Sequence, residues 1–182
     1  MRDARRWTVG LGAGMAAVFV AALVVKILPQ IDLVAVGSRA PAFHARNLRT
    51  GRLASLAEYR GKVVLLNLWA TYCEPCRVEM PSLERLYRQQ GGPDFQVVAV
   101  SIDEQGDSVV AAFARELGLS FDILHDQSAA IKAEYQATGV PESWVIDRSG
   151  VIVKKVTGAS AWDAPVSEAL IRRLIEERGD GQ

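Results

Sequence analysis

Residues 61–81 read GKVVLLNLWATYCEPCRVEMP, and this stretch decides how the rest of the chain is interpreted. It opens with a nearly continuous apolar run, residues 62–70, which is typical of a buried central strand in a parallel sheet. Two residues later come Cys73 and Cys76, the only cysteines in the 182-residue chain. A helical pattern follows, with side chains suited to one buried face at spacings of 4, 3 and 4: Cys76, Met80, Leu83 and Tyr87. The stretch therefore predicts a strand, a turn that carries two thiols, and an amphipathic helix.

The position of the cysteine pair indicates chemistry rather than a structural staple. A bridge between residues three apart closes a very small loop, so its entropic stabilisation is slight. Cys73 falls at the expected helix N-terminus, where free backbone N–H groups and the positive end of the helix dipole stabilise a thiolate. Thiols in such C-x-x-C sites have pKa values of roughly 3.5–7.5. We expect Cys73 to be the attacking thiol and Cys76 the resolving one, with Pro75 suited to the first turn.

The N-terminus predicts a membrane anchor outside the globular domain. Residues 1–6 carry three arginines, and residues 7–25 then run for 19 residues without a charge. A bilayer needs about 20 apolar residues as helix, whereas the apolar region of a cleavable signal is about 7–15 residues long. We expect a cytoplasmic segment (1–6), a transmembrane signal anchor (7–28) and a linker (29–40), with the domain outside. The small residues Ala35 and Gly37 leave cleavage open as an alternative.

The rest of the chain alternates strand and helix patterns. Equal numbers of basic and acidic residues, 21 each, argue against a nucleic-acid binder, which should have a basic face. An Arg-Ser-Gly sequence at residues 148–150 indicates a hairpin. The elements expected beyond the cysteine helix are strands at 95–102, 121–124, 143–147 and 151–156; helices from Asp107 or Ser108 to 118, at 128–136 and at 164–178; and an N-terminal hairpin of 42–48 with 52–53.

Several motifs together resemble a known family. They are the Gly61–Cys76 run, the Arg77-Val78-Glu79-Met80-Pro81 sequence after it, the helix-containing stretch 105–133, and Gly139-Val140-Pro141-Glu142 before an apolar strand. Over residues 40–175 the chain resembles membrane-anchored, extracytoplasmic thioredoxin-like proteins of the TlpA/ResA type. The resemblance implies an α/β thioredoxin-like fold for residues 41–182. That fold has a central mixed β-sheet flanked by helices, an N-terminal hairpin and a helix-containing insertion, preceded here by one N-terminal transmembrane helix.

The resemblance also assigns roles to individual residues. It implies that Pro141 follows a cis peptide bond beside the cysteines, and that Val140 offers backbone groups to a bound substrate chain. Asn67 stands where cytosolic thioredoxins have a proton-carrying Asp, and an amide cannot titrate. Glu79, three residues after Cys76, is then the expected proton relay. The alternative for Glu79 is a solvated helix residue or a partner of Arg77.

Four further residues complete the expected substrate-binding surface. Trp69 is expected to cover the thiol pair, to pack in the core, or both. Tyr72 replaces the Trp usual in the family motif and affects the shape of the docking surface. Glu74 is expected either to tune the thiols and recognise partners or to be a plain solvated residue. Pro75 lies between the cysteines and completes the set.

These features predict a thiol–disulfide oxidoreductase whose redox centre is the Cys73–Cys76 disulfide, with no other cofactor. By resemblance it is a reductant of protein disulfides, apocytochrome c during cytochrome c maturation among them, recharged by a membrane electron donor of the DsbD/CcdA kind. The expected location is the bacterial inner membrane, single-pass, with the domain on the periplasmic or extracytoplasmic side. Disulfide chemistry persists in such compartments.

Two other functions compete with this one. Two thiolates can hold Cu(I), so the alternative is a copper(I)-handling protein or, by resemblance, a copper-site thiol reductase of the TlpA type. A closed zinc site needs four ligands, and only His44 and His125 could complete one, so no metal site is expected. A thiol peroxidase is disfavoured because Thr71 precedes Cys73 by two residues, not three, and the preceding Pro of that motif is missing.

Overall fold

The computed structural model describes residues 34–177. The expected cytoplasmic segment, the anchor and the first part of the linker lie outside the described residues and stay predictions. Within the described part of the chain, no helix is long and apolar enough to cross a membrane.

One mixed seven-stranded sheet forms the centre of the domain, in the order β2-β1-β5-β4-β3-β6-β7. Strand β3 runs parallel to β4, which runs parallel to β5. On its other side β3 pairs with β6 in antiparallel fashion, and β6 continues into the β6–β7 hairpin. The strands are β1 His44–Asn47, β2 Leu53–Ser55, β3 Val63–Trp69, β4 Phe95–Ser101, β5 Asp122–His125, β6 Glu142–Ile146 and β7 Ile152–Thr157.

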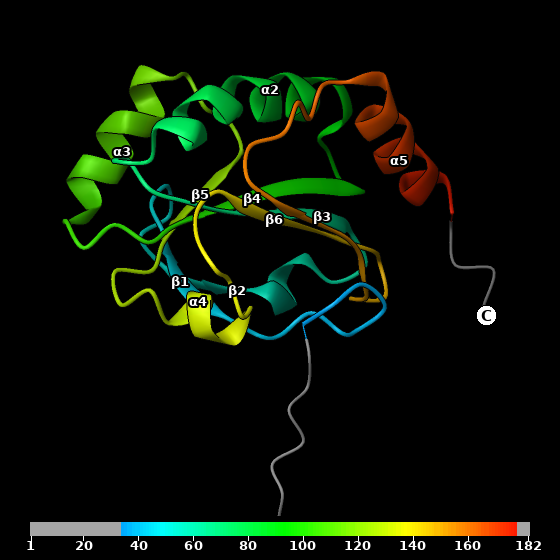
Figure 1. Ribbon diagram of the computed structural model, residues 1–182, viewed down its shortest axis with the longest axis horizontal. Coiled ribbons are helices and arrows are strands. Elements are labelled where there is room, and N and C mark those ends of the chain that lie inside the picture. Colours follow the sequence, from blue (N-terminus) through cyan, green and yellow to red (C-terminus); the bar gives the residue numbers. More distant parts are fainter. Residues whose placement is uncertain (1–33, 178–182) are drawn as a thin grey trace, which may run out of the picture. The chain divides into compact units, whose positions relative to one another are not determined.

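Helices cover both faces of this sheet, as Figure 1 shows. Helices α2 (Glu74–Gln90), α3 (Asp107–Glu116) and α5 (Pro165–Glu176) lie on one side. The short α4 (Ala130–Glu134) and the 3₁₀ helix η1 (Leu56–Tyr59) lie on the other. The predicted thioredoxin-like α/β domain is confirmed, with β1–β2 as the N-terminal hairpin. Helix α3 and strand β5 lie within the stretch 105–133 that was expected to contain a helix.

Burial explains why the central strands read as unbroken apolar runs. All seven residues of β3 and all seven of β4 are buried, because helices cover both faces of the sheet. The largest fully buried side chains include Trp69, Trp144 and Trp162. Fully burying a large apolar side chain contributes about 1.5–3 kcal/mol. Against this background the one polar residue of β3, Asn67, stands out.

Some element boundaries differ from the sequence-based expectation. Helix α4 is shorter than the predicted 128–136, because Ala129 and Gln136 have left-handed backbone (φ 54° and 48°) and so close the helix at both ends. The predicted cap of α3 was wrong: Gly106 is the N-cap and makes no side-chain cap bond. The second hairpin strand, predicted at 52–53, is β2 at 53–55.

The last residues of the expected linker are part of the folded domain. The backbone N–H of Gly37 donates to the carbonyl of Ile152 at 2.8 Å, and the N–H of Ala40 donates to that of Gly150 at 2.9 Å. Ser38 in turn accepts from the N–H of Ile152 at 2.9 Å. Residues 37–40 therefore run along the start of β7.

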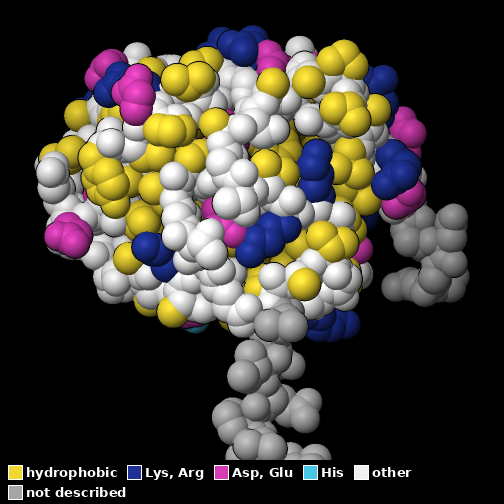
Figure 2. Space-filling model, viewed as in Figure 1, with side chains coloured by type: hydrophobic (Ala, Val, Ile, Leu, Met, Phe, Trp, Pro, Cys, Tyr) yellow, Lys and Arg dark blue, Asp and Glu magenta, His cyan; other side chains and the backbone are white. Residues whose placement is uncertain are grey.

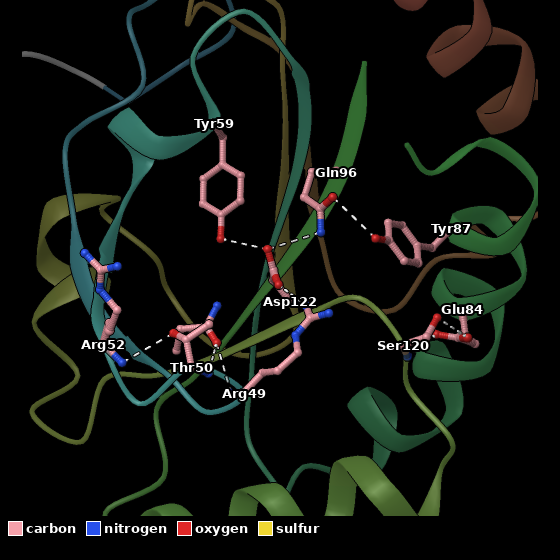
Figure 3. A network of polar contacts seen from close by, with 10 residues as sticks. Arg49, Thr50, Arg52, Tyr59, Glu84, Tyr87, Gln96, Ser120 and Asp122 are labelled. Atoms are coloured by element: carbon pink, nitrogen blue, oxygen red, sulfur yellow. Dashed lines mark hydrogen bonds and ion pairs between the residues drawn. The ribbon is translucent and has the colours of Figure 1, made fainter. Parts of the chain in front are cut away.

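A polar network lies toward the amino ends of β4 and β5 (Figure 3). Asp122 accepts from the Tyr59 hydroxyl at 3.0 Å and from Gln96 Nε2 at 3.2 Å, and it pairs with Arg49. Burial beside Asp122 raises the pKa of Tyr59 well above its ordinary value, so this phenol remains a hydrogen-bond donor. The network ties η1 to the sheet and is separate from the cysteines, which follow the carboxyl end of β3.

Candidate active site

The two cysteines form a disulfide at the N-terminus of α2. Cys73 is the N-cap of the helix, its Cα lies 5.3 Å from that of Cys76, and its Sγ accepts the backbone N–H of Cys76 at 3.2 Å. Cys73 is 7% exposed, whereas Cys76 is fully buried. Of the two sulfurs, only that of Cys73 belongs to a residue with exposed surface, and it already accepts a helix N-terminal N–H. This geometry fits the attacking and resolving roles expected for the two thiols.

A buried carboxylate fixes the turn that leads from β3 to Cys73. Asp103, fully buried just after β4, accepts the backbone N–H of Thr71 at 2.9 Å and the Thr71 hydroxyl at 2.5 Å. The Ser101 hydroxyl donates to the same carboxylate at 2.6 Å. Because β3 and β4 are parallel neighbours, Asp103 lies at the strand end from which the turn departs. Sequence reasoning missed this residue; its position just after a buried strand was the available signal.

Glu79 is buried on α2, three residues after Cys76. Its side chain is 2% exposed, so the alternative of a solvated helix glutamate is wrong. Burial raises the pKa of Glu79 from 4.5 to about 7, and hydrogen bonds from Trp162, Ser160 and Asn67 limit the rise. Arg77 pairs with Glu116 instead, at 3.0 Å. A carboxyl group that titrates near neutrality and lies one turn beyond Cys76 suits proton transfer.

The segment 160–163, between β7 and α5, is hydrogen-bonded to Glu79 and to its neighbours on α2. The indole N–H of Trp162 and the backbone N–H of Ser160, the latter at 3.3 Å, both donate to Glu79 Oε1. The backbone N–H of Trp162 donates to Ser82 Oγ at 3.1 Å, and Asp163 pairs with Arg85 at 2.6 Å. Glu79, Ser82 and Arg85 recur every three residues on α2 and so share one face. Sequence reasoning missed Trp162 because nothing in the sequence shows which helix this segment reaches.

Asn67 contacts the other oxygen of Glu79. Its Nδ2 donates to Glu79 Oε2 at 3.4 Å and to the Ser143 hydroxyl at 2.9 Å. Its Oδ1 is buried without a partner among the described residues. An amide carries both a donor and an acceptor. Rotation of this amide would thus offer Oδ1 to a protonated Glu79, so Asn67 can serve either form of the acid without titrating itself.

The Val140–Pro141 peptide bond is cis, as the resemblance implies. Strand β6 begins at Glu142, which lies opposite Leu68 in the antiparallel register with β3. Pro141 is therefore placed beside the end of β3, where the turn to Cys73 begins. Pro141 is buried and Val140 is half-buried.

The surface beside the disulfide is partly apolar. Tyr72 and Val78 are 70% and 69% exposed, and Glu74 and Pro75 are exposed between them in the sequence. Trp69 is fully buried, and its ring centroid lies 5.1 Å from that of Phe113 on α3. The structure thus gives Trp69 the core-packing role, and its covering of the thiols stays a prediction. Val78 is the exposed side chain near the site that the sequence-based set omitted.

Of three other polar residues singled out in the sequence, two lie in structural contacts and one is exposed. His44 is exposed on β1. His125 is buried, with its ring nitrogens 2.6 Å from Asp107 Oδ1 and 2.8 Å from the Asp103 carbonyl oxygen. Glu142 is fully buried and pairs with Lys155 at 2.8 Å. Among residues 34–177, no group of three or more His, Cys, Asp or Glu side chains is arranged to hold a metal ion.

A dithiol couple lies at the N-terminus of the helix that follows the central strand of a mixed sheet. Together with a cis proline beside the end of that strand and a buried acid on the helix, it defines a thioredoxin-like thiol–disulfide oxidoreductase. The chain matches the AhpC/TSA family over residues 36–155 and belongs to that family.

Individual relatives agree with this assignment. The chain is 41% identical to the thioredoxin-like protein YneN of Bacillus subtilis over 64% of its own length and 68% of the relative's. It is 38% identical to the thiol-disulfide oxidoreductase ResA of Geobacillus thermodenitrificans, over 69% and 71% of the two chains. A thiol:disulfide interchange protein from Bacteroides sp. has a similar structure, with a TM-score of 0.67 at 26% identity, covering 81% of this chain and 95% of that one. The protein is thus an enzyme of this class.

Proposed function

We propose that this oxidoreductase works as a reductant of disulfides in extracytoplasmic proteins, including the haem-binding cysteines of apocytochrome c. One observation carries the proposal: Cys73, on a helix N-terminus, keeps 7% of its surface exposed, whereas Cys76 and Glu79 are 0% and 2% exposed. A site built in this way can attack a partner disulfide and then resolve the complex from inside.

The first step uses the reduced enzyme. The Cys73 thiolate attacks one sulfur of the substrate disulfide, the substrate S–S bond breaks, and a mixed disulfide forms while the other substrate sulfur leaves as a thiolate. The backbone N–H of Cys76, which points at Cys73 Sγ, stabilises the thiolate before attack.

The second step needs a proton acceptor for Cys76. Cys76 is fully buried, and its thiol must lose a proton before it attacks the mixed disulfide. Glu79 lies on the adjacent turn of α2, and its pKa of about 7 matches the pH at which a base must exchange protons. Attack by Cys76 closes the Cys73–Cys76 disulfide and releases the second substrate sulfur, so two electrons pass to the substrate.

The substrate chain docks beside the disulfide. Tyr72, Glu74 and Pro75 offer exposed side chains there, and the half-buried Val140 ahead of the cis Pro141 offers backbone groups for pairing with an extended chain. The oxidised enzyme is then re-reduced by a membrane donor of the DsbD/CcdA kind, and the anchor predicted at 7–28 keeps it close to that donor. In this proposal the domain works on the periplasmic or extracytoplasmic side of the bacterial inner membrane.

A redox titration of the full chain tests the direction of electron flow. We expect a reduction potential near that of thioredoxin, about −270 mV, and a value near that of DsbA, about −120 mV, would overturn the reductant assignment. The substrate is tested with an oxidised C-x-x-C-H peptide. The Cys76→Ser variant should trap it as a mixed disulfide through Cys73, whereas Cys73→Ser should trap nothing.

A further inference from the structure

A concave site lies at the end of the sheet opposite the disulfide. It is a pocket of about 430 Å³, within the size range of small-molecule sites. Its walls come from residues 39–42 of the N-terminal segment, from η1 and the start of β3, and from the β6–β7 turn at 146–150. Since β3 is seven residues long, this end is about 20 Å from the cysteine turn.

The pocket combines an apolar lining with an excess of positive charge. Leu56, Val64 and Ile146 supply aliphatic surface. The ionisable side chains around them, apart from Tyr59, are four cations and one carboxylate: Arg39, Arg60, Lys62, Arg148 and Asp147. On the face of the molecule that Figure 2 shows, basic and acidic side chains are intermixed. The pocket differs from that face in having four cations to one carboxylate.

Among residues 34–177, three of these cations have no carboxylate partner. Arg148 is held in place by Asp94 at 3.0 Å and by the carbonyl oxygens of Gly61 and Ile175, both at 2.8 Å. Arg39 donates only to the Ser149 carbonyl, at 3.2 Å. In the part of the chain that the structure describes, Arg60 and Lys62 form no ion pair.

The single carboxylate does not neutralise them. Asp147 Oδ1 is turned into its own hairpin, where it accepts the backbone N–H groups of Ser149 and Val151, both at 2.9 Å, and the Ser149 hydroxyl at 2.7 Å. Guanidinium groups suit phosphate oxygens, and an adjoining aliphatic surface suits a ligand with an apolar part.

We propose that this basic pocket binds the headgroup of an anionic phospholipid and so orients the domain at a membrane surface. Clusters of Lys and Arg are attracted to anionic leaflets, and the attraction falls off within a Debye length. Arg39 lies 14 residues after Val25, the last residue of the 19-residue uncharged run. Fourteen extended residues span at most about 50 Å, so the chain length keeps the pocket within reach of the membrane that the predicted anchor would enter. The disulfide, at the other end of β3, would then face away from the lipid.

Hydrogen exchange of the full chain in lipid nanodiscs tests this inference. Nanodiscs of phosphatidylcholine alone are compared with nanodiscs containing about one third phosphatidylglycerol. We expect slower exchange of the backbone amides in 37–42, 56–64 and 146–151 only with the anionic lipid. Equal exchange in both lipids would overturn the proposal. Protection of the same amides by inorganic phosphate without lipid would also overturn it and would assign the pocket to a free anion.

Two matched variants separate the effect of the pocket cations from the effect of net charge. The triple variant Arg39→Gln, Arg60→Gln, Lys62→Gln should lose the protection, with lipid affinity at this site reduced on the order of 100-fold. The triple variant Arg52→Gln, Arg115→Gln, Arg172→Gln removes the same charge from exposed positions outside the pocket. This variant should keep the protection of the amides. Thermal unfolding and disulfide reduction in solution should be unchanged in both variants. Protection that survives in the first variant, or is lost in the second, contradicts the assignment.

Discussion

At the scale of single residues, Glu79 is a carboxyl group whose proton affinity is set without any charged neighbour. Burial raises its pKa to about 7, and three neutral donors, from Trp162, Ser160 and Asn67, pull it back down. Each donor favours the ionised form, whereas burial favours the protonated form. The acid therefore titrates near neutrality, where a group that must both accept and release a proton is most useful.

The substitution Glu79→Gln tests this acid directly. It keeps the size of the side chain and removes its titration. We expect resolution of a mixed disulfide on Cys73 to slow by about 100-fold, the lower end of typical general acid–base contributions. In the wild-type protein the rate should rise with pH toward a plateau above about pH 7, because the base is then ionised, and in the variant this rise should vanish. The measurement is single-turnover release of a chromogenic thiol from pH 5 to 8.5.

Glu74→Gln serves as the control for that experiment. Glu74 is exposed on the same helix, so its loss should leave the wild-type pH profile in place. A rise near pH 7 that persists in Glu79→Gln would assign the proton transfer to another group.

Trp162→Phe tests whether the segment over α2 adjusts Glu79. The change removes the indole N–H that donates to Glu79 Oε1 and keeps an aromatic ring. Because this hydrogen bond lowers the pKa of Glu79, its loss should raise that pKa and move the rise in resolution rate to higher pH. Trp144→Phe is a matched control, since Trp144 is also fully buried but its N–H has no partner among the described residues. The idea fails if both variants show the same profile.

At the scale of elements, Asp103, which follows the carboxyl end of β4, fixes the turn between β3 and α2. The Asp103 carboxylate accepts two hydrogen bonds from Thr71 and one from Ser101, all inside the protein. Two parallel strands thus cooperate: one delivers the cysteines, and its neighbour supplies the anchor that fixes their turn.

Thr71→Val should destabilise the domain by about 2 kcal/mol, since a hydrogen bond from a hydroxyl to a buried carboxylate contributes about 1.5–3 kcal/mol. Val keeps the shape and the backbone N–H of Thr71 but loses its hydroxyl. Thr71→Ser keeps the hydroxyl and should stay within about 1 kcal/mol of the wild type. Urea unfolding of the oxidised protein measures both. Equal midpoints for the two variants would show that the hydroxyl contact contributes nothing.

Most elements were predictable because their periodicity is strong. The apolar run of β3 and the spacing of Cys76, Met80 and Leu83 on α2 fixed the strand, the turn and the buried helix face, and all three are confirmed. Adjacent apolar residues were harder: Val109 is 38% exposed because Val110 and Phe113 already occupy the buried face of α3. On α5, the apolar Val166 is likewise 72% exposed. Periodicity identifies the apolar face of a helix but does not show which part of that face the rest of the protein covers.

The site was predictable only in its local part. Cys73, Cys76 and Glu79 lie on one helix, so spacing alone relates them. The contacts that tune them come from far along the chain: Trp162 is 83 residues from Glu79, and Asp103 is 32 residues from Thr71. Such contacts depend on strand order and loop path, which a single sequence does not specify.

At the scale of the whole molecule, the two ends of the sheet carry different chemistry. The turn after the carboxyl end of β3 holds the disulfide, with a buried acid on the helix that follows, whereas the pocket at its amino end is lined by four cations and one carboxylate. The buried acid has a consequence for the fold as well as for catalysis, because a group that binds its proton more tightly when folded makes stability depend on pH.

The folded domain should lose stability as pH rises from about 4.5 to about 7. In that window the folded state keeps the Glu79 proton while the unfolded chain, with a pKa of 4.5, has released it, so each step upward in pH favours unfolding. The full difference is about 3 kcal/mol and is reached above pH 7. Urea unfolding of wild type and Glu79→Gln at several pH values between 4 and 8 measures it. The free energy of unfolding of Glu79→Gln, relative to that of the wild type, should rise across this window and then level off. If the two proteins depend on pH in the same way, the pKa of Glu79 is not raised in the folded state.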